Sequence, residues 1–465
     1  MKFFHILLAA LLINSAAVAQ NQTGTLSPVL SEDSLPFTLQ LEAIPFSLPV
    51  GLQSYASAIY KNRWIFLAGR TNGLHGFDNN GNNFPPEFQN TTIYIFDPAT
   101  GSYASRDLKD PSSGLSQATI DTLSVTSSQS FQIQGTLYMV GGYGIDTATN
   151  DFGTKSTLTA IDLKKIMAWV YTGAQNGARS AIRQISHPLL QVTGGFLYRA
   201  SPHNPFLLML GQNFIGKYVP NSNGIYTEQI RPFWLQDDGR HLAIIPHASS
   251  ITYPDYRRRD LNVVPVLHKL EPGYVALAGV FTLESGVWTV PILITADGES
   301  TEPDPDAAAT FKQAMNQYNC PAFCLYSVKR DTNYIVLPGG ISYGYFANGA
   351  FQTDSEFPFI NQITTIQIDK NGQFTQHLMN AEYPFIASTG TNPGNQLLFG
   401  AEAEFFPAYN VPLFQNNAIQ FDNLPKTPVI IGYIAGGIMS TLPNTATQAD
   451  STASPYIFTV KLIPK

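Results

Sequence analysis

The sequence is short of charge, of long hydrophobic runs and of known catalytic motifs, and each shortage excludes a class of protein. Charged residues make up 13% of the 465 positions, and the formal net charge of −7 disfavours a nucleic-acid partner. No apolar run after residue 19 is long enough to cross a membrane as a helix. There is no nucleophile elbow, zinc-protease or phosphate-loop motif, and the 8 histidines are scattered, so we expect no metal site and no cofactor.

Cysteine is also scarce, and the two cysteines, Cys320 and Cys324, lie close together with no histidine beside them. Two thiols are too few for a zinc site, which needs about four ligands. Their spacing also differs from that of the redox CxxC motif. In an oxidising compartment a local disulfide is the favoured prediction, and two free buried thiols are the alternative.

Residues 1–19 have the three parts of a secretory signal peptide. Lys2 opens the segment, an apolar run follows from Ile6 to Ile13, and small residues lead to a cleavage site after Ala19. We therefore expect a secreted or periplasmic protein, and the sequence leaves the choice between these two locations open. Residues 20–36 are polar and contain proline and serine, which predicts a flexible leader. Residues 37–465 are expected to form one domain, and the chain is expected to be a monomer.

The chain is rich in residues that favour short strands and turns, with 22 Tyr, 30 Phe, 36 Gly and 32 Pro. Apolar strands that end at glycine recur along the chain, and most are followed by a later strand that closes on aspartate. The recurrence indicates a repeat of four-stranded antiparallel units. Packing such units around an axis buries both faces of each sheet. The strand-ending glycines are Gly69, Gly141, Gly211, Gly279, Gly339 and Gly436, and the aspartates are Asp97, Asp162, Asp237, Asp297 and Asp369.

The clearest copies of the repeat are Leu137 to Gly142 and Tyr433 to Gly437, where the strand ends in Gly-Gly. In these features the sequence resembles the kelch family of β-propellers, within the kelch and galactose-oxidase-like superfamily. The resemblance is partial at residues 67–70, 209–212 and 277–280, where the second glycine is missing, and the kelch tryptophan is mostly absent. It covers nearly all of the mature chain, and it implies an all-β propeller.

Repeat arithmetic favours six blades with an insertion, and a seventh blade around Gln396 to Phe406 is the alternative. The last repeat ends at Lys465 without a fourth strand, whereas Phe37 to Ala43 forms a strand that has no repeat of its own. We expect this N-terminal strand to complete the last blade and close the ring. The Ala-rich stretch from Asp306 to Met315 predicts a helix. The acidic stretch 297–306 is either a solvated loop or a calcium site, with the solvated loop favoured.

The binding surface of a propeller is formed by loops at one end of its channel, so residues just after the glycine-ended strands are candidates for ligand contact. Aromatic, guanidinium and carboxylate groups there would suit a sugar or a peptide. The candidates are Arg70, His75, Tyr143, Asn213, Tyr343 and Tyr345, joined by Glu402 and Glu404.

Two functions follow as hypotheses. The first is a non-enzymatic binding module that recognises a protein or glycan ligand through these loops. The second is a carbohydrate-active enzyme with its site in the channel mouth, for which the resemblance supplies sialate mutarotases and sialidases as examples. Arg231, in Ile230-Arg231-Pro232, faintly matches the sialidase Arg-Ile-Pro motif, although aspartate boxes are absent. A cluster of Arg, Glu and Tyr in the channel mouth would favour the enzyme, and apolar or mutually filling loops would favour the binder.

Overall fold

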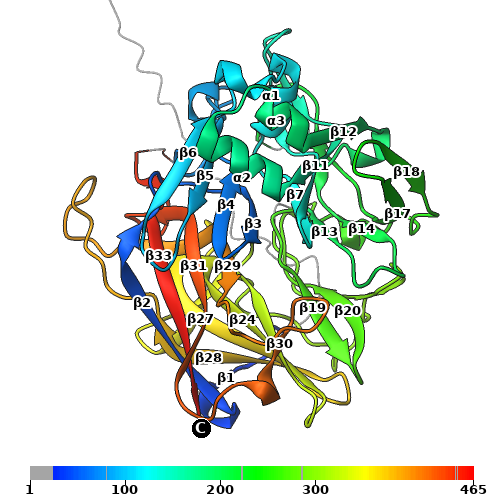
Figure 1. Ribbon diagram of the computed structural model, residues 1–465. Helices are drawn as coiled ribbons and strands as arrows, with labels where there is room; N and C mark the ends of the chain where they lie inside the picture. The colour runs from blue at the N-terminus through cyan, green and yellow to red at the C-terminus, as the bar shows by residue number, and fades with distance from the viewer. Residues whose placement is uncertain (1–24, 80, 221–223, 284–285, 446, 448) are drawn as a thin grey trace, which may run out of the picture.

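Antiparallel sheets packed around a channel make up the structure (Figure 1). The computed structural model describes residues 25–79, 81–220, 224–283, 286–445, 447 and 449–465, so the expected signal peptide, residues 1–19, lies outside the described residues. The prediction of an all-β propeller with four-stranded antiparallel blades is confirmed. Among the described residues, no helix combines the length and apolar character needed to cross a membrane.

Four of the sheets have four strands each, in the order in which they occur along the chain. The first sheet begins with a hairpin, in which Ala56 lies opposite Leu67 across a turn at Lys61-Asn62. The first two sheets are β3 (Ala56–Tyr60), β4 (Arg63–Leu67), β5 (Thr92–Phe96), β6 (Tyr103–Asp107), and β7 (Gln129–Ile133), β8 (Thr136–Val140), β11 (Thr157–Asp162), β12 (Ile182–Ser186). The next two are β13 (Phe196–Tyr198), β14 (Phe206–Met209), β17 (Ile230–Asp237), β18 (Leu242–Pro246), and β19 (Val263–His268), β20 (Glu271–Ala276), β21 (Ile292–Thr295), β22 (Ser300–Thr301).

Two wider sheets complete the structure. One has six strands, β1 (Val29–Ser31), β28 (Phe374–Glu382), β27 (Phe359–Ile368), β24 (Thr332–Ile341), β23 (Phe323–Ser327) and β30 (Ile419–Gln420), of which the two edge strands pair parallel to their neighbours. The other has five, β2 (Phe37–Ser47), β33 (Tyr456–Pro464), β31 (Val429–Ser440) and β29 (Leu398–Pro407), with β32 (Ser451–Ala453) beside β31. The N-terminal β2 lies antiparallel to the C-terminal β33, with Leu41 opposite Val460, and Figure 1 shows the two strands side by side.

The expectation of six blades with an insertion needs a correction. About five sheets have the four or five strands of a blade, whereas the sixth is widened to six strands by the parallel edge strands β1 and β30. β1 comes from the segment that we expected to be a flexible leader. The stretch around Gln396 to Phe406 supplies β29, which pairs with β31 in the last sheet.

Three two-stranded hairpins follow the glycine-ended strands and carry several of the candidate residues. They are β9 (Tyr143–Asp146) with β10 (Asp151–Thr154), β15 (Gln212–Phe214) with β16 (Gly224–Tyr226), and β25 (Gly344–Ala347) with β26 (Ala350–Thr353). Each hairpin is separate from the sheet that precedes it, because the chain bends sharply at the intervening glycines.

The helices lie together at one side of the molecule, over the first two sheets (Figure 1). Asp162 caps α2 by accepting a hydrogen bond from the Lys165 amide, and Gly173 ends the helix in the left-handed conformation. Trp169 on α2 is buried, and its indole donates to Ser112 at 3.0 Å. The helices are α1 (Gln117–Leu123), α2 (Leu163–Thr172) and α3 (Gly177–Ala181), and the 3₁₀ turns are Glu32–Ser34, Pro86–Phe88, Pro111–Ser113, Pro188–Leu190, Pro254–Tyr256 and Phe421–Asn423.

The strand-ending glycines allow neighbouring sheets to approach closely. Gly141 has a φ of +63°, and a Cβ atom at this position would overlap the carbonyl of Val192 in the next sheet. Gly436, with a φ of +67°, would place its Cβ 2.6 Å from the carbonyl oxygen of Leu52, which precedes the first sheet. Glycine alone combines this conformation with the absence of a side chain.

A hydrophobic cluster fills each junction between consecutive sheets, and the last sheet packs against the first. At that final junction Trp64 stacks on Phe406 with ring centroids 4.6 Å apart, and it meets Tyr433 edge to face at 5.3 Å. Tyr55 also crosses this junction and donates a hydrogen bond of 2.7 Å to the carbonyl of Ala435. Aromatic pairs of this kind each contribute about 0.5–1.5 kcal/mol beyond the burial of their area.

Two further expectations are wrong. Residues 306–315 form turns and an extended segment instead of a helix, because Gln376 accepts hydrogen bonds from the amides of Ala314 and Met315 and holds them to the six-stranded sheet. Cys320 and Cys324 are free and buried instead of forming a disulfide. Each thiol has its own contact, Cys320 with the Asn262 amide and Cys324 with the Asn333 side chain, and burial raises the pKa of both thiols.

Candidate functional site

A ring of residues in the left-handed conformation surrounds the channel, with one residue from each of the six sheets. Each residue lies at or just before the innermost strand of its sheet, and each is half-buried although the residues around it are mostly buried. At every position except Gly194, the side chain of this left-handed residue faces the channel. The ring consists of Ser54 (φ 51°), Ser127 (50°), Gly194 (66°), Asp260 (46°), Asn319 (49°) and Glu402 (57°), and we call it the neck.

Backbone hydrogen bonds link one neck residue to the next. Ser127 donates to the carbonyl of Ser54 at 3.2 Å, Gly194 to Ser127 at 3.1 Å, and Asp260 to Gly194 at 2.9 Å. Glu402 donates to Asn319 at 2.8 Å, and Ser54 donates to Glu402 at 3.4 Å. The last of these bonds joins the first sheet to the final one, so the geometry of the neck depends on contact between distant parts of the chain.

A second set of equivalent positions lies above the neck, and we call it the wall. The residue before each neck residue bridges to the residue that follows a glycine-ended strand, for example Gln53 to Arg70 and Thr126 to Tyr143. All six of these partner residues are buried. The wall consists of Arg70, Tyr143, Gln212, Val280, Ile341 and Ile438.

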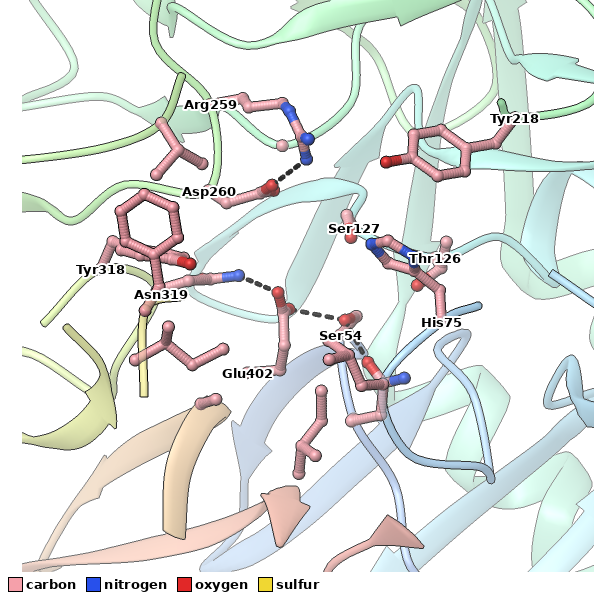
Figure 2. Close-up of a pocket in the computed structure, with 18 of the residues that line it drawn as sticks. Ser54, His75, Thr126, Ser127, Tyr218, Arg259, Asp260, Tyr318, Asn319 and Glu402 are labelled. Carbon is pink, nitrogen blue, oxygen red and sulfur yellow. Dashed lines mark hydrogen bonds and ion pairs between the residues drawn. The ribbon is translucent and has the colours of Figure 1, made fainter. Parts of the chain in front are cut away.

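The neck separates two cavities. The upper cavity, of about 630 Å³, opens at the channel mouth, and the lower cavity, of about 190 Å³, lies between the innermost strands. All six neck residues line both cavities. Hydroxyl, amide and carboxyl groups therefore form the floor of the upper cavity (Figure 2).

Aromatic side chains form much of the upper cavity's side. Tyr143, Phe214 and Tyr218 belong to one buried cluster, with Phe84 packed against it. The ring centroids of Phe84 and Tyr218 are 5.4 Å apart, and those of Phe214 and Tyr218 are 5.2 Å apart. A polar floor beneath an aromatic side is the arrangement that orients a ligand carrying both hydroxyls and an apolar face.

Glu402 is the central group of the floor. Its Oε1 accepts a hydrogen bond from the Asn319 amide, and its Oε2 lies 2.5 Å from the Ser54 hydroxyl, which also contacts Gln53 Oε1 (Figure 2). Burial, with the charge of Asp260 as the next cause, raises the pKa of Glu402 to about 8. A serine hydroxyl has one proton to donate, so both contacts of Ser54 are satisfied when protonated Glu402 donates to Ser54 and Ser54 donates to Gln53.

Glu404 lies below the neck and faces the lower cavity. Burial of Glu404 inside the protein raises its pKa to about 7. Its side chain is exposed to the space of the lower cavity. Ser128 Oγ and Gln129 Oε1, which belong to residues lining the same cavity, have no hydrogen-bond partner within the described part of the chain. Glu404 is therefore the carboxyl group that the structure places in the lower cavity below the neck.

Arg259 and Asp260 form an ion pair beside the floor (Figure 2). Arg259 Nε also donates to the Tyr226 hydroxyl at 3.2 Å, and the guanidinium lies 5.1 Å from the centroid of the Phe281 ring. Burial lowers the pKa of Arg259, but the charge of Asp260 and the contact with Tyr226 outweigh burial and raise it overall. Arg259 therefore stays charged, and its charge is balanced by its neighbour in sequence.

His75, a predicted ligand contact, lines the upper cavity. Its ring packs against Phe84 and Tyr218, with centroids 5.0 Å and 4.9 Å away. Burial lowers its pKa to about 4, so the imidazole is neutral near pH 7. Because Nδ1 contacts the carbonyl of Gly76 at 2.7 Å, Nδ1 carries the proton and Nε2 is an acceptor.

Tyr143 and Arg70 have structural partners. The Tyr143 hydroxyl donates to the Gly216 carbonyl at 3.0 Å and accepts from the Tyr218 amide at 2.7 Å, so its ring lines the cavity while its hydroxyl is occupied. Arg70 is buried outside the cavity, where it donates to Asn72 Oδ1 and to the Pro85 carbonyl. Arg70 therefore holds the loop that contains Asn72 and Pro85, and Tyr143 holds the segment from Gly216 to Tyr218.

The remaining candidates do not meet in the cavity. Asn213 lies on β15, and Tyr345 lies on β25 with its hydroxyl 3.5 Å from Gln352. Tyr343 packs against the hydrophobic cluster around Phe357 and Ile341. Arg231 is buried on β17, where its Nη1 donates to the Leu189 carbonyl. These four positions remain untested as ligand contacts.

Sequence reasoning missed Ser54, Asp260 and Asn319. A signal was present, because most neck residues are small or are Asp or Asn, the residue types that tolerate the left-handed conformation best. Within the described residues, no group of three or more His, Cys, Asp or Glu side chains could hold a metal ion.

Comparison with known proteins adds little to this geometry. No family model matches the sequence, and no curated protein matches it. Among solved structures the chain is similar to one described as the structure of YjhT, with a TM-score of 0.46 and 10% sequence identity over 89% of this chain and 96% of that chain. At this identity and score the likeness carries no conclusion about function.

Proposed function

We propose that this chain is an exported β-propeller that binds a glycan, or another polyhydroxylated ligand, in the upper cavity. The observation that carries the proposal is the cavity itself, which combines an aromatic side with a floor of hydroxyl, amide and carboxyl groups. Its volume of about 630 Å³ lies within the range of about 300–1,000 Å³ that small-molecule sites occupy. A sugar has the matching surface, because its ring has an apolar face and its edge carries hydroxyls.

The finer architecture is part of the proposal. We take β2 as the strand that closes the ring by completing the last sheet. The pairing of β2 with β33 supports closure, as do the stacking of Trp64 on Phe406 and the hydrogen bond from Ser54 to Glu402. Deletion of β2 should then abolish cooperative unfolding, which calorimetry would detect, because the last sheet would lose its outer strand.

Export and the monomeric state stay predictions. The signal pattern of residues 1–19 supports export with cleavage after Ala19, and mass spectrometry of the mature protein from its native host would test it. A mature N-terminus at Gln20 in an extracytoplasmic fraction is the expected result. An intact Met1 in the cytoplasmic fraction would contradict it.

A second candidate function is proton transfer on a bound sugar. The raised pKa of Glu402, with the charge of Asp260 among its causes, favours this function, because a carboxyl protonated near neutral pH can serve as a general acid beside a carboxylate base. Against it, both oxygens of Glu402 are engaged, by Asn319 and by Ser54. We therefore rank binding first.

Glycan-array screening followed by calorimetry on the best ligand tests the proposal. We expect Asn319→Ala to weaken binding by about tenfold, because the variant loses a hydrogen-bonding amide from the floor and releases Glu402. Tyr409→Ser, which changes a 79%-exposed side chain, is the matched control and should bind as the wild type does. Binding that is unaffected by Asn319→Ala would place the ligand elsewhere.

Turnover separates the two functions. Anomer interconversion of the bound sugar, followed by proton NMR, should proceed at the uncatalysed rate if the chain only binds. Acceleration that is lost in Glu402→Gln while affinity is retained would establish the second function instead.

A further inference from the structure

The positive charge available to a ligand in the upper cavity is limited. Of the described residues that line the cavity, Arg259 alone has a guanidinium or ammonium group. The cavity also contains three acidic residues, Asp260, Glu356 and Glu402. His75 adds no charge near pH 7, since burial lowers its pKa to about 4.

Arg259 is already neutralised. Its guanidinium is paired with Asp260, donates to the Tyr226 hydroxyl and packs against the Phe281 ring. The side chains of Arg259 and Asp260 are 12% and 19% exposed, so solvent screens the pair less than it would screen a surface pair. A carboxylate ligand would have to displace Asp260 in order to reach this cation.

The neighbouring arginines are also committed to other partners. Arg257 donates to the carbonyls of Phe281 and Thr282, and Arg258 is buried with Glu302 as its partner at 2.6 Å. Arg70 and Arg231 lie outside the cavity. An acidic sugar would therefore lose the hydration of its carboxylate without gaining an unpaired cation, which is unfavourable.

We infer that the upper cavity selects uncharged sugars over acidic ones, because Asp260 occupies the guanidinium that an acidic sugar would need. This inference deepens the proposed glycan-binding function and rests on it. Asp260 is then a specificity-determining residue, and Arg259 is the latent anion site that it masks.

Exchange of Asp260 tests the inference, and the protein should tolerate the change. The φ of Asp260 is 46°, and asparagine is among the residue types that adopt this conformation most readily. Asp260→Asn keeps the shape of the side chain and removes its charge, which leaves Arg259 unpaired. Affinities for N-acetylglucosamine and for N-acetylneuraminic acid or glucuronic acid would be measured by calorimetry at pH 7 in low salt.

The wild type should prefer the neutral sugar, and Asp260→Asn should shift the ratio of affinities toward the acidic sugars by at least about tenfold, the effect of one hydrogen bond to a charged group. Asp260→Glu keeps the charge and should keep the wild-type preference. The double variant Arg259→Gln/Asp260→Asn should lose the shift. Circular dichroism would confirm that each variant folds.

The outcomes separate the inference from the proposed function. A wild type that binds acidic sugars more tightly than neutral ones overturns the inference and leaves glycan binding intact. An Asp260→Asn variant that folds and shows no shift also overturns it. The absence of binding to any sugar overturns the proposed function, and the inference with it.

Discussion

The wall and the neck each take one residue from every sheet, yet the side chains of the two sets differ in chemistry. Wall residues such as Val280, Ile341 and Ile438 are buried and mostly apolar. Neck residues such as Asp260, Asn319 and Glu402 are polar and half-buried. The wall residue pairs with the residue just before the neck residue, so the two sets lie on directly paired segments.

The difference comes from the backbone. A neck residue itself has a positive φ, whereas each wall residue directly follows a glycine of positive φ. The wall residues other than Arg70 line the upper cavity with buried side chains. A repeated scaffold can therefore keep one set of positions for stability and leave the other free to vary in chemistry. Changes to buried aliphatic wall residues such as Ile438 should mainly alter stability, and changes to neck side chains should mainly alter recognition.

The largest effect is expected from a glycine that supports the wall. Gly141→Ala should destabilise the fold by about 2–5 kcal/mol, because the new Cβ would overlap the Val192 carbonyl and the φ of +63° is itself strained. Gly372→Ala is the matched control, since its φ is +76° and it has nothing within 4 Å. Denaturant unfolding would compare the two, and equal losses would contradict the close packing of sheets.

The next largest effect is the difference in stability expected between a wall variant and a neck variant. Ile438→Ala in the wall should cost about 2–5 kcal/mol, because Ile438 is 3% exposed and leaves a cavity. Ser127→Ala in the neck should change stability by less than about 0.5 kcal/mol. Urea midpoints of the two variants would check the split, and similar midpoints would contradict the division between wall and neck.

Stability should depend on pH through Glu402. Its pKa is about 8 in the folded protein and near its ordinary value of 4.5 when unfolded, so between these pH values the folded state holds more protons. Stability from this group is therefore present below about pH 4.5 and is lost as pH rises to about 8.

Glu402→Gln removes that dependence. The variant should gain stability relative to the wild type as pH rises through this window, which urea unfolding at pH 5 and pH 8 would measure. Glu356→Gln, an exposed acid at the rim of the same cavity, should follow the wild type at both pH values. A Glu402→Gln variant whose stability falls in parallel with the wild type would contradict the raised pKa.

The smallest effect concerns Cys320, which adjoins the neck residue Asn319. Because both cysteines are free, a reductant should leave the thermal midpoint unchanged. Both thiols should react with a thiol reagent in denaturant. Neither should react readily in the native state, since both are buried. A midpoint lowered by the reductant would restore the disulfide expectation.

Local patterns predicted the repeat but not the site. The recurring strand-ending glycines, such as Gly141 and Gly436, located the places where neighbouring sheets approach closely. Glu402 was among the predicted candidates only because it lies in a stretch that departs from the repeat. Its partner Ser54 is 348 residues away, and contact between them depends on the packing of the last sheet against the first.

Tertiary contacts also overrode two local signals. The Ala-rich segment from 306 to 315 has high helix propensity, but the hydrogen bonds that Gln376 accepts from Ala314 and Met315 favour an extended path. The spacing of Cys320 and Cys324 suggested a small loop, yet separate partners hold the two thiols apart. Propensity and spacing report on isolated segments, and these segments are fixed by their neighbours.

The central claim is that the neck forms the floor of a sugar site, and the titration of Glu402 tests it most directly. Carbon-13 NMR of the glutamate carboxyls, with Glu402→Gln to assign the signal, would be recorded against pH with and without a saturating neutral sugar. We predict a pKa of about 8 in the free protein and a clear change on binding, because a ligand on the floor alters the surroundings of this carboxyl. A sugar that binds without changing this titration would contradict the account.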